Sequence, residues 1–234
     1  KEIKTIVYLE NYGFSKNIIN DFFKPFFAGI FLEGELATSS RMFEFIFKMF
    51  AQGDVAIPES GIQEIPIQIA KKLTKTNFIF NTQVDKIRDG EILLKNKNKI
   101  KSDYTIVATE AKNLIDGYNN RSVKWKSCVN FYFEIDKKSL RGGLIGLIPG
   151  DNSVINNIFF VSGIKSKIVG IKELLSVTVI DSKSFSNEDL IDRVEYELKK
   201  YCDINVIRLI SQFNIPKSLP DLNDISYTKI SSEF

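Results

Sequence analysis

The side chains that most often carry out catalysis are absent or scattered in this 234-residue sequence. It contains no histidine, which excludes Ser-His-Asp and Cys-His catalysis and removes the commonest zinc ligand. Its 29 acidic residues give no carboxylate pair that we can propose, so we assign no catalytic residue and no metal site. Cys128 and Cys202 lack metal-ligand spacing. Two buried free thiols are favoured over a disulfide, because a domain of this size needs no covalent staple.

A phosphate-binding glycine loop is also missing. Gly142-Gly143 with Gly146 lies in a strand-rich half and lacks the helix that must follow such a turn. With 32 basic and 29 acidic residues the charge is nearly balanced, and no basic run is interleaved with aromatics, so we expect no nucleic-acid partner. No stretch approaches the ~20 apolar residues of a membrane span, and no signal peptide opens the chain. We therefore expect a cytoplasmic protein, with peripheral membrane contact as an alternative.

Hydrophobic periodicity predicts the helices. They cover residues 39–51, 62–73 and 187–201. Pro66 must fall early in the second helix, and Ser186 is placed to cap the third. In the aromatic stretch 21–31 (DFFKPFFAGIF), Pro25 and Gly29 argue against one long helix.

The helix around residues 42–50 is apolar nearly all round, which predicts that it is buried or lines a cavity. Ordinary core is the first interpretation, a substrate-channel wall the second and a membrane-docking face the third. We expect this helix and the aromatic stretch to wall one apolar cavity. Arg41 at the helix start either forms a surface ion pair or meets an acidic substrate group.

Strands are predicted in two groups. The first comprises residues 78–80, 84–87, 91–94 and 104–109. The second is a mainly antiparallel sheet from residues 122–180 and 205–214, with strands at 128–135, 144–148, 154–161, 174–180 and 206–213. Composition and periodicity alone therefore indicate a globular α/β or α+β protein.

Three stretches carry a family resemblance. The first is residues 25–43, with PFFAGIFL followed by LATSSRMF. The second, residues 57–73, is similar to a Pro-x-x-Gly-Gly element, although Ser60 replaces its first glycine. The third joins Val84-x-x-Ile87 to residues 104–109 (YTIVAT). In this order and spacing they resemble the flavin-containing amine oxidase superfamily, which includes protoporphyrinogen oxidase and the phytoene and carotene desaturases.

The resemblance implies an α+β fold, in which a substrate domain with a mainly antiparallel sheet and helices accompanies part of a discontinuous FAD-binding domain. The implied segments are 1–56 (helical part of the substrate domain), 57–118 (FAD-binding domain), 119–220 (substrate-domain sheet and helix) and 221–234 (return toward the FAD-binding domain). In the family a Gly-x-Gly-x-x-Gly turn lies near the N-terminus and a Gly-Asp motif near the C-terminus, and neither is present at those places in this sequence. We therefore expect an internal piece of a longer flavoprotein that does not hold FAD by itself.

By resemblance, Val84 would hold the adenine of FAD through its backbone amide and carbonyl. The strand end at Ala108, Thr109 and Glu110 would pass close to the pyrophosphate and ribityl groups. Plain strand core remains the alternative for Val84, and a strand-end hydrogen bond the alternative for Thr109.

The implied reaction is hydride transfer from substrate to flavin, which needs few protein acids or bases. Dense phenylalanine around residues 22–50 favours an apolar substrate such as a carotenoid or porphyrinogen over a small charged amine. The alternatives are a family member that binds FAD without catalysis, and a non-catalytic α+β module that docks a partner or membrane through its aromatic stretch. The oligomeric state is left open.

Overall fold

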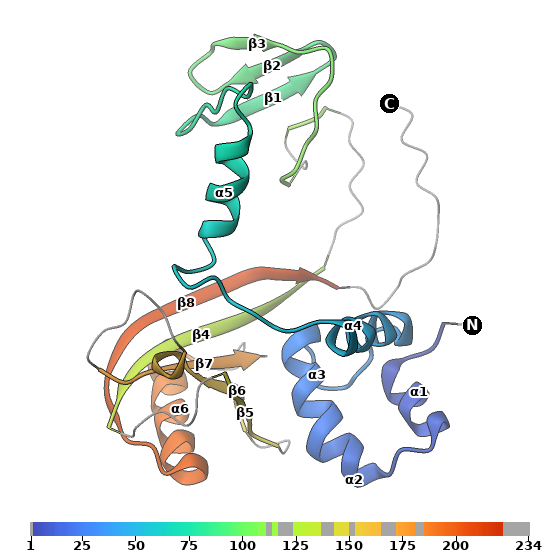
Figure 1. Ribbon diagram of the computed structural model, residues 1–234, viewed down its shortest axis with the longest axis vertical. Helices are drawn as coiled ribbons and strands as arrows, with labels where there is room; N and C mark the ends of the chain where they lie inside the picture. The colour runs from blue at the N-terminus through green and yellow to red at the C-terminus, as the bar shows by residue number, and fades with distance from the viewer. Residues whose placement is uncertain are drawn as a thin grey trace. The chain divides into compact units, whose positions relative to one another are not determined.

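The structure is a computed structural model that describes residues 2–110, 114–116, 124–136, 143–149, 153–164, 172–180 and 185–221. The chain divides into two compact units. Unit 1 comprises Lys1–Glu64 and Lys124–Phe234, and unit 2 comprises Ile65–Val123. Helices and antiparallel strands make up the units, which confirms the predicted α+β class (Figure 1).

The first part of unit 1 is helical. Its elements are α1 (Thr5–Tyr12), α2 (Lys16–Ile18), the π-helical turn η1 (Ile19–Phe23), α3 (Lys24–Phe31) and α4 (Ser40–Gln52). They pack around a small aromatic core, in which the ring centroids of Phe27 and Phe43 are 4.7 Å apart. The predicted helix at 39–51 is confirmed as α4, whose N-cap Ser39 accepts a hydrogen bond from the Arg41 amide at 3.2 Å.

Residues 16–31 form one uninterrupted helical segment, so the prediction that Pro25 and Gly29 would break it is wrong. In an ordinary α-helix the proline ring clashes with the carbonyl four residues earlier. Here the wider π turn η1 directly precedes α3 and gives the ring of Pro25 room. The proline therefore widens the helix locally without ending it.

Gly29 lies inside α3 because the helix packs closely on β6 (Ile155–Phe160). A Cβ at this position would collide with the Oδ1 atom of Asn156 and lie 3.1 Å from Nδ2 of Asn157. The Asn156 side chain is buried, and its Nδ2 donates to the Pro25 carbonyl at 3.0 Å. Glycine thus permits the approach, and the asparagine amide joins the helix to the strand.

The second part of unit 1 is an antiparallel sheet with the order β5-β6-β7-β4-β8. Its strands are β4 (Trp125–Ile135), β5 (Ile145–Leu147), β6, β7 (Leu174–Ile180) and β8 (Val206–Pro220), with the 3-10 turn η2 (Val161–Gly163) after β6. α6 (Asn187–Cys202) follows β7 in the chain. The predicted antiparallel sheet and the predicted helix at 187–201 are both confirmed.

Strand alternation gives the sheet its core. Because successive side chains point to opposite faces, Phe131, Phe133 and their neighbours on β7 share one face. This face packs against α6, and together they bury Val129, Phe131, Phe133, Leu175, Val177, Val179, Leu190, Val194 and Leu198. Asp189 in the first turn of α6 donates its amide to the Ser186 side chain at 3.2 Å, the cap that the sequence predicts.

Unit 2 contains α5 (Glu64–Lys72) from Ile65 onward and an antiparallel sheet of β1 (Val84–Arg88), β2 (Glu91–Leu94) and β3 (Lys99–Lys101). These elements confirm the predicted helix at 62–73 and the strands at 84–87 and 91–94. Pro66 stands at the third helical position, where its missing N–H leaves no hydrogen bond unmade.

The predicted strands at 78–80 and 104–109 are wrong, since neither range is a strand. β1 pairs on its other side with residues 114–116, where the Ile87 amide donates to the Leu114 carbonyl at 2.7 Å. A strand needs a neighbour for its backbone groups, and the described residues place none beside 104–109. Tyr104 and Ile106 are each 93% exposed as a result.

Neither cysteine forms a disulfide, as predicted. Cys128 is buried in β4, and Cys202 is half-buried at the end of α6.

We predict that Gly29→Ala lowers the free energy of unfolding by about 1–3 kcal/mol, because the added methyl group must push Asn156 away from α3. Without that collision, the same change inside a helix stabilises by roughly 0.5–1 kcal/mol. Gly53→Ala is the matched control, since it has open space and an extended φ of −158°. Urea denaturation of the three proteins measures the difference. A more stable Gly29→Ala protein would show that the helix does not need this close approach.

Candidate functional site

The face of the sheet opposite α6 is the strongest candidate for a functional surface. Since α6 packs on the face of Phe131 and Val177, the alternate residues of β4 and β7 point the other way. Those residues include Asn130, Tyr132, Ser176 and Thr178, which are half-buried. We call this surface the open face.

Strand register arranges the open face in two rows of side chains. One row crosses the sheet through Leu147, Asn157, Thr178, Asn130 and Phe213. The other crosses through Ile145, Phe159, Ser176, Tyr132 and Ser211. Polar and apolar side chains therefore meet on one surface, the composition typical of small-molecule sites.

Asn130 is the polar centre of the open face. Its Nδ2 donates to Ser176 Oγ at 3.2 Å and to Thr178 Oγ1 at 3.1 Å. Ser176 Oγ also lies 3.4 Å from Asn130 Oδ1. These hydrogen bonds between neighbouring strands fix the orientation of the Asn130 amide. The remaining lone pair of its Oδ1 atom therefore has a defined position.

Aromatic rings flank this centre. Tyr132 meets Phe213 edge to face, with ring centroids 5.8 Å apart. Phe159 is half-buried in the second row. Edge-to-face pairs are rigid and present flat apolar surface to a ligand.

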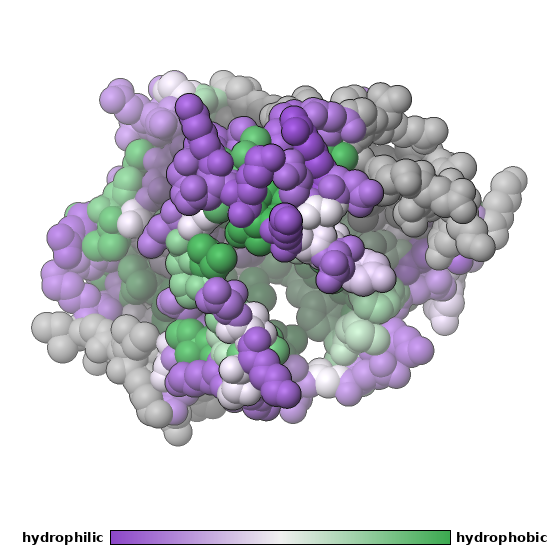
Figure 2. All heavy atoms as spheres, turned by 90° about the horizontal axis from the view of Figure 1, so that it is seen from above, coloured by the Kyte–Doolittle hydropathy of each residue, from purple (hydrophilic) through white to green (hydrophobic). Residues whose placement is uncertain are grey.

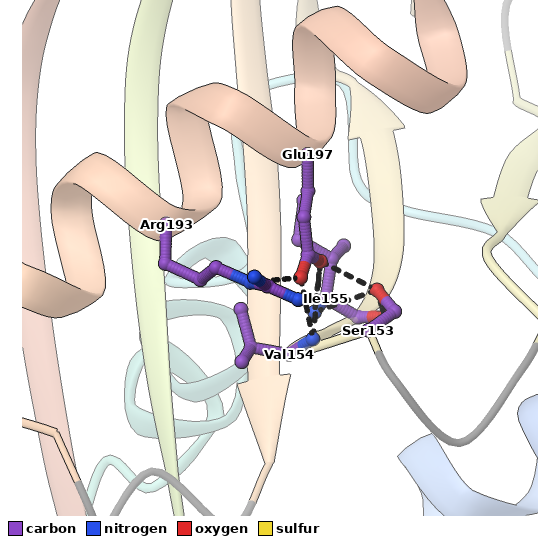
Figure 3. Close-up of polar contacts among 5 residues, drawn as sticks. All are labelled: Ser153, Val154, Ile155, Arg193 and Glu197. Carbon is purple, nitrogen blue, oxygen red and sulfur yellow. Dashed lines mark hydrogen bonds and ion pairs between the residues drawn. The ribbon is translucent and has the colours of Figure 1, made fainter.

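A buried carboxylate fixes the strand that borders this surface. Glu197 of α6 is fully buried and accepts hydrogen bonds from Ser153 Oγ at 2.6 Å and from the Val154 amide at 3.0 Å. It also accepts from the Ile155 amide at 3.3 Å and pairs with Arg193 at 2.6 Å (Figure 3). The carboxylate thereby ties the start of β6 to α6, directly before Asn156 and Asn157.

A second buried carboxylate lies near the end of β4. Glu134 pairs with Lys172 at 2.7 Å and with Arg208 at 2.6 Å. The hydrogen bond from Lys172, followed by that from Arg208, holds the pKa of the Glu134 carboxyl below its ordinary value. A carboxyl that stays ionised is a poor general acid, so Glu134 is not a proton donor at neutral pH.

The residues predicted to face the cofactor all belong to unit 2. Val84 begins β1 opposite Leu94 and is half-buried. Ala108, Thr109 and Glu110 are exposed and lie outside any strand, so the predicted strand end is not formed there. Val84 thus lies on a strand, whereas the other three lie in an exposed segment without strand structure.

The predicted apolar cavity walled by α4 and the aromatic stretch stays a prediction. Only Ser40 and Phe43 of α4 are buried, whereas Phe45 is 58% and Phe47 50% exposed. A cavity of about 660 Å³ lies beside η1, α3 and the start of β6, and α4 does not line it. Its polar lining comes from Asn20, Asp21, Lys24, Glu35, Ser153 and Asn156. The interpretation of α4 as ordinary core is therefore wrong for its outward side.

Apolar exposure is not confined to α4. On the face seen in Figure 2, apolar atoms lie open among hydrophilic ones. Arg41 is exposed in the first turn of α4 and remains a candidate without an assigned role. Among the described residues no helix is long and apolar enough to cross a membrane, and no group of three His, Cys, Asp or Glu side chains could hold a metal.

The sequence signal for the open face is a polar set that alternates with the apolar residues of 129–135, and it was not predicted as a site. Asn130 on one strand and Ser176 and Thr178 on another occupy every second position, which is what one shared face requires. That the two strands are neighbours follows only from the register of the folded sheet.

Comparison with known families assigns the chain. The family model for flavin containing amine oxidoreductases matches residues 5–212. Because this match spans most of the chain, the protein belongs to that family, and the resemblance seen in the sequence is confirmed. No curated protein matches it.

Solved structures share the fold at low sequence identity. An oxidoreductase from Methanosarcina mazei superposes with a TM-score of 0.72 at 14% identity, covering 91% of this chain and 56% of that one. A proposed protoporphyrinogen oxidase from Exiguobacterium sp. 255-15 gives 0.67 at 15%, covering 94% and 56%. A protein from Pyrococcus furiosus gives 0.68 at 12%, covering 94% and 59%. The chain thus spans 56–59% of the length of these proteins.

We predict that Glu197→Gln lowers the free energy of unfolding by about 1–3 kcal/mol. Its amide nitrogen cannot accept the bonds from the Ser153–Ile155 segment, so buried donors lose their partner. Asp192→Asn is the control, since this exposed carboxylate lies on the same helix, and we expect it to change stability by less than about 0.5 kcal/mol. Urea denaturation compares them. Equal midpoints for the two variants would show that the carboxylate does not hold β6.

Proposed function

We propose that the chain is part of an FAD-dependent oxidoreductase that removes hydride from a largely apolar substrate. Family membership supports the flavin chemistry. The observation that carries the substrate side is the open face, a surface of fixed aromatic and polar side chains on a sheet whose other face is closed by α6. On this proposal the open face is the protein wall against which the substrate lies.

Unit 2 would supply part of the cofactor site. By resemblance, Val84 offers backbone groups to the adenine, and Ala108, Thr109 and Glu110 pass near the pyrophosphate and ribityl. β1 fits this role because its backbone is held between β2 and residues 114–116. These contacts suffice for one end of the cofactor only, since the sequence contains no Gly-x-Gly-x-x-Gly turn to receive the pyrophosphate.

The flavin, when bound, accepts the hydride, so the protein's task is to bind and orient the substrate and to exclude water. The residues described here agree with that division of labour. Histidine is absent, and Glu134 remains ionised in its ion pairs. We assign no acid or base of this chain to the hydride transfer itself.

We predict that the 234-residue chain is colourless and that a longer protein carrying a glycine-rich dinucleotide turn ahead of it is yellow. Binding must overcome roughly 4–15 kcal/mol of lost translational and rotational freedom, and the backbone contacts of one strand cannot offset this. Absorbance spectra near the flavin band, with and without added FAD, test both proteins. Stoichiometric flavin on the 234-residue chain would overturn the expectation that this chain does not hold FAD by itself. A longer protein that never binds flavin would overturn the proposed function.

Turnover separates an active enzyme from a family member that only binds FAD. Anaerobic mixing of the yellow protein with carotenoid, porphyrinogen and amine panels should bleach the flavin band with a largely apolar compound. Bleaching by a small polar amine alone would contradict the proposed substrate class.

The outward side of α4 supports a second proposal, that this helix rests on a membrane surface. Four of its large apolar side chains are 43–58% exposed: Phe45, Phe47, Met49 and Phe50. Phe26 and Phe50 are in ring contact, so the surface continues onto α3. Amphipathic helices with exposed aromatic and basic side chains bind the lipid headgroup region in this way, and Lys48 lies exposed on the same helix.

We predict that the chain sediments with vesicles of phosphatidylcholine and phosphatidylglycerol and that Phe45→Glu reduces the bound fraction severalfold, because a charge cannot enter the apolar layer. Tyr196→Glu is the control, since it places the same charge at an aromatic residue of α6 that is 55% exposed. Equal binding by the two variants would contradict the proposal that α4 rests on a membrane.

A further inference from the structure

The polar centre of the open face has hydrogen-bonding capacity that the described residues leave unused. Asn130 donates both N–H groups, one to Ser176 and one to Thr178. Its Oδ1 receives only the long 3.4 Å contact from Ser176 and retains a free lone pair. Thr178 Oγ1 already accepts from Asn130, and the described residues provide no acceptor for its own hydroxyl proton. One acceptor and one donor therefore face outward side by side.

A substrate that covers this centre removes it from water. A hydroxyl or amide that loses its hydrogen bonds on burial costs roughly 1–3 kcal/mol by mutational measures. A pure hydrocarbon would bury both Asn130 Oδ1 and the Thr178 hydroxyl without replacing their hydrogen bonds to water. A ligand with one hydroxyl, carbonyl or ring N–H placed at this point would satisfy at least one of them. The open face thus disfavours hydrocarbons and favours ligands with a polar atom.

The surroundings of the centre are flat and apolar. Phe213 lies beside Asn130 in the first row, and Tyr132 and Phe159 lie in the second. Aromatic rings at these positions pack against a planar skeleton of one or a few rings. Asn130 Oδ1 and the Thr178 hydroxyl alone would bind any small alcohol. The aromatic rings are what restrict the ligands to planar ones.

We infer that Asn130 and Thr178 select a planar, mainly apolar substrate that carries one hydrogen-bonding group, and that they discriminate against pure hydrocarbons. This inference rests on the proposed function, because that proposal makes the open face the substrate wall. It narrows the substrate class from apolar compounds in general to those with an oxygen or nitrogen over the centre of the sheet.

The experiment uses a probe pair of equal shape, 2-naphthol and 2-methylnaphthalene, on the 234-residue chain. Titration followed by ¹⁵N spectra of side-chain amides reports directly on Asn130 and requires no flavin. We expect 2-naphthol to bind about tenfold more tightly, the ratio that one hydrogen bond of ordinary strength provides, and to shift the Asn130 amide signals. Equal affinities for the two probes, or no binding of either one, would overturn the inference.

Thr178→Val removes the donor while keeping the size and the β-branched shape of the side chain, so the sheet is retained. We expect the preference for 2-naphthol to fall to about twofold or less in Thr178→Val and in Asn130→Leu. Ser211→Ala is the matched control, since it deletes a hydroxyl from the same face at the edge of the second row and should leave the tenfold ratio intact.

Two results distinguish this inference from the function on which it rests. If the longer protein lacks flavin but the tenfold ratio and its loss in Thr178→Val are observed, the polar centre stands and the oxidoreductase assignment fails. If flavin binds but Thr178→Val keeps the full ratio, the specificity assignment is wrong and the proposed function is untouched.

Discussion

The contact on which unit 1 depends is the apolar layer between α6 and the five-stranded sheet. Phe131, Leu175, Val177, Val194 and Leu198 are each completely buried in it. Because strand side chains alternate, filling this layer from one face leaves the other set of residues facing away from it. The open face is thus a consequence of the core, since its Asn130 and Thr178 are held in register by the same strands that bury Phe131 and Val177.

Buried polar groups extend this order to the neighbouring elements. Glu197 of α6 is fully buried, yet it accepts hydrogen bonds from donors at the start of β6 and pairs with Arg193 of its own helix. A buried carboxylate is tolerated only when it is paired and hydrogen-bonded, so the segment Ser153–Ile155 must keep one geometry. Asn156 follows this segment directly and joins it to α3, because its side chain donates a hydrogen bond to the Pro25 carbonyl. A hydrogen bond therefore contributes to the position of α3 on the sheet, in addition to the close packing at Gly29.

The elements predictable from the sequence are those whose cause is local. The Ser186 cap and the apolar stripe of α6, and the alternation in β4, lie within the segments that they specify. The failures have distant causes. Gly29 was interpreted as a helix breaker because its partner, Asn156, is 127 positions away in the chain. The apolar run 104–109 has the composition of a strand, but composition does not supply a neighbouring strand, and β1 bonds to residues 114–116 instead.

The same distinction explains the candidate site. Family resemblance pointed to Val84 and to residues 108–110 as contacts of FAD. Backbone groups would make these contacts, and many residue types can supply a backbone group, so residue type alone does not identify such positions. The open face depends on side-chain chemistry, but its rows combine residues from five strands, and no single stretch of sequence shows them together. Dense phenylalanine near residues 22–50 favoured an apolar substrate over a small charged amine, but composition counts side chains without locating them. Once Phe45 and Phe47 are placed at the surface and Asn130 on the open face, the exposed apolar side chains of α4 and the mixed polar and aromatic side chains of the open face form two separate surfaces of unit 1. Both surfaces depend on strand register and helix packing, which residue composition does not record.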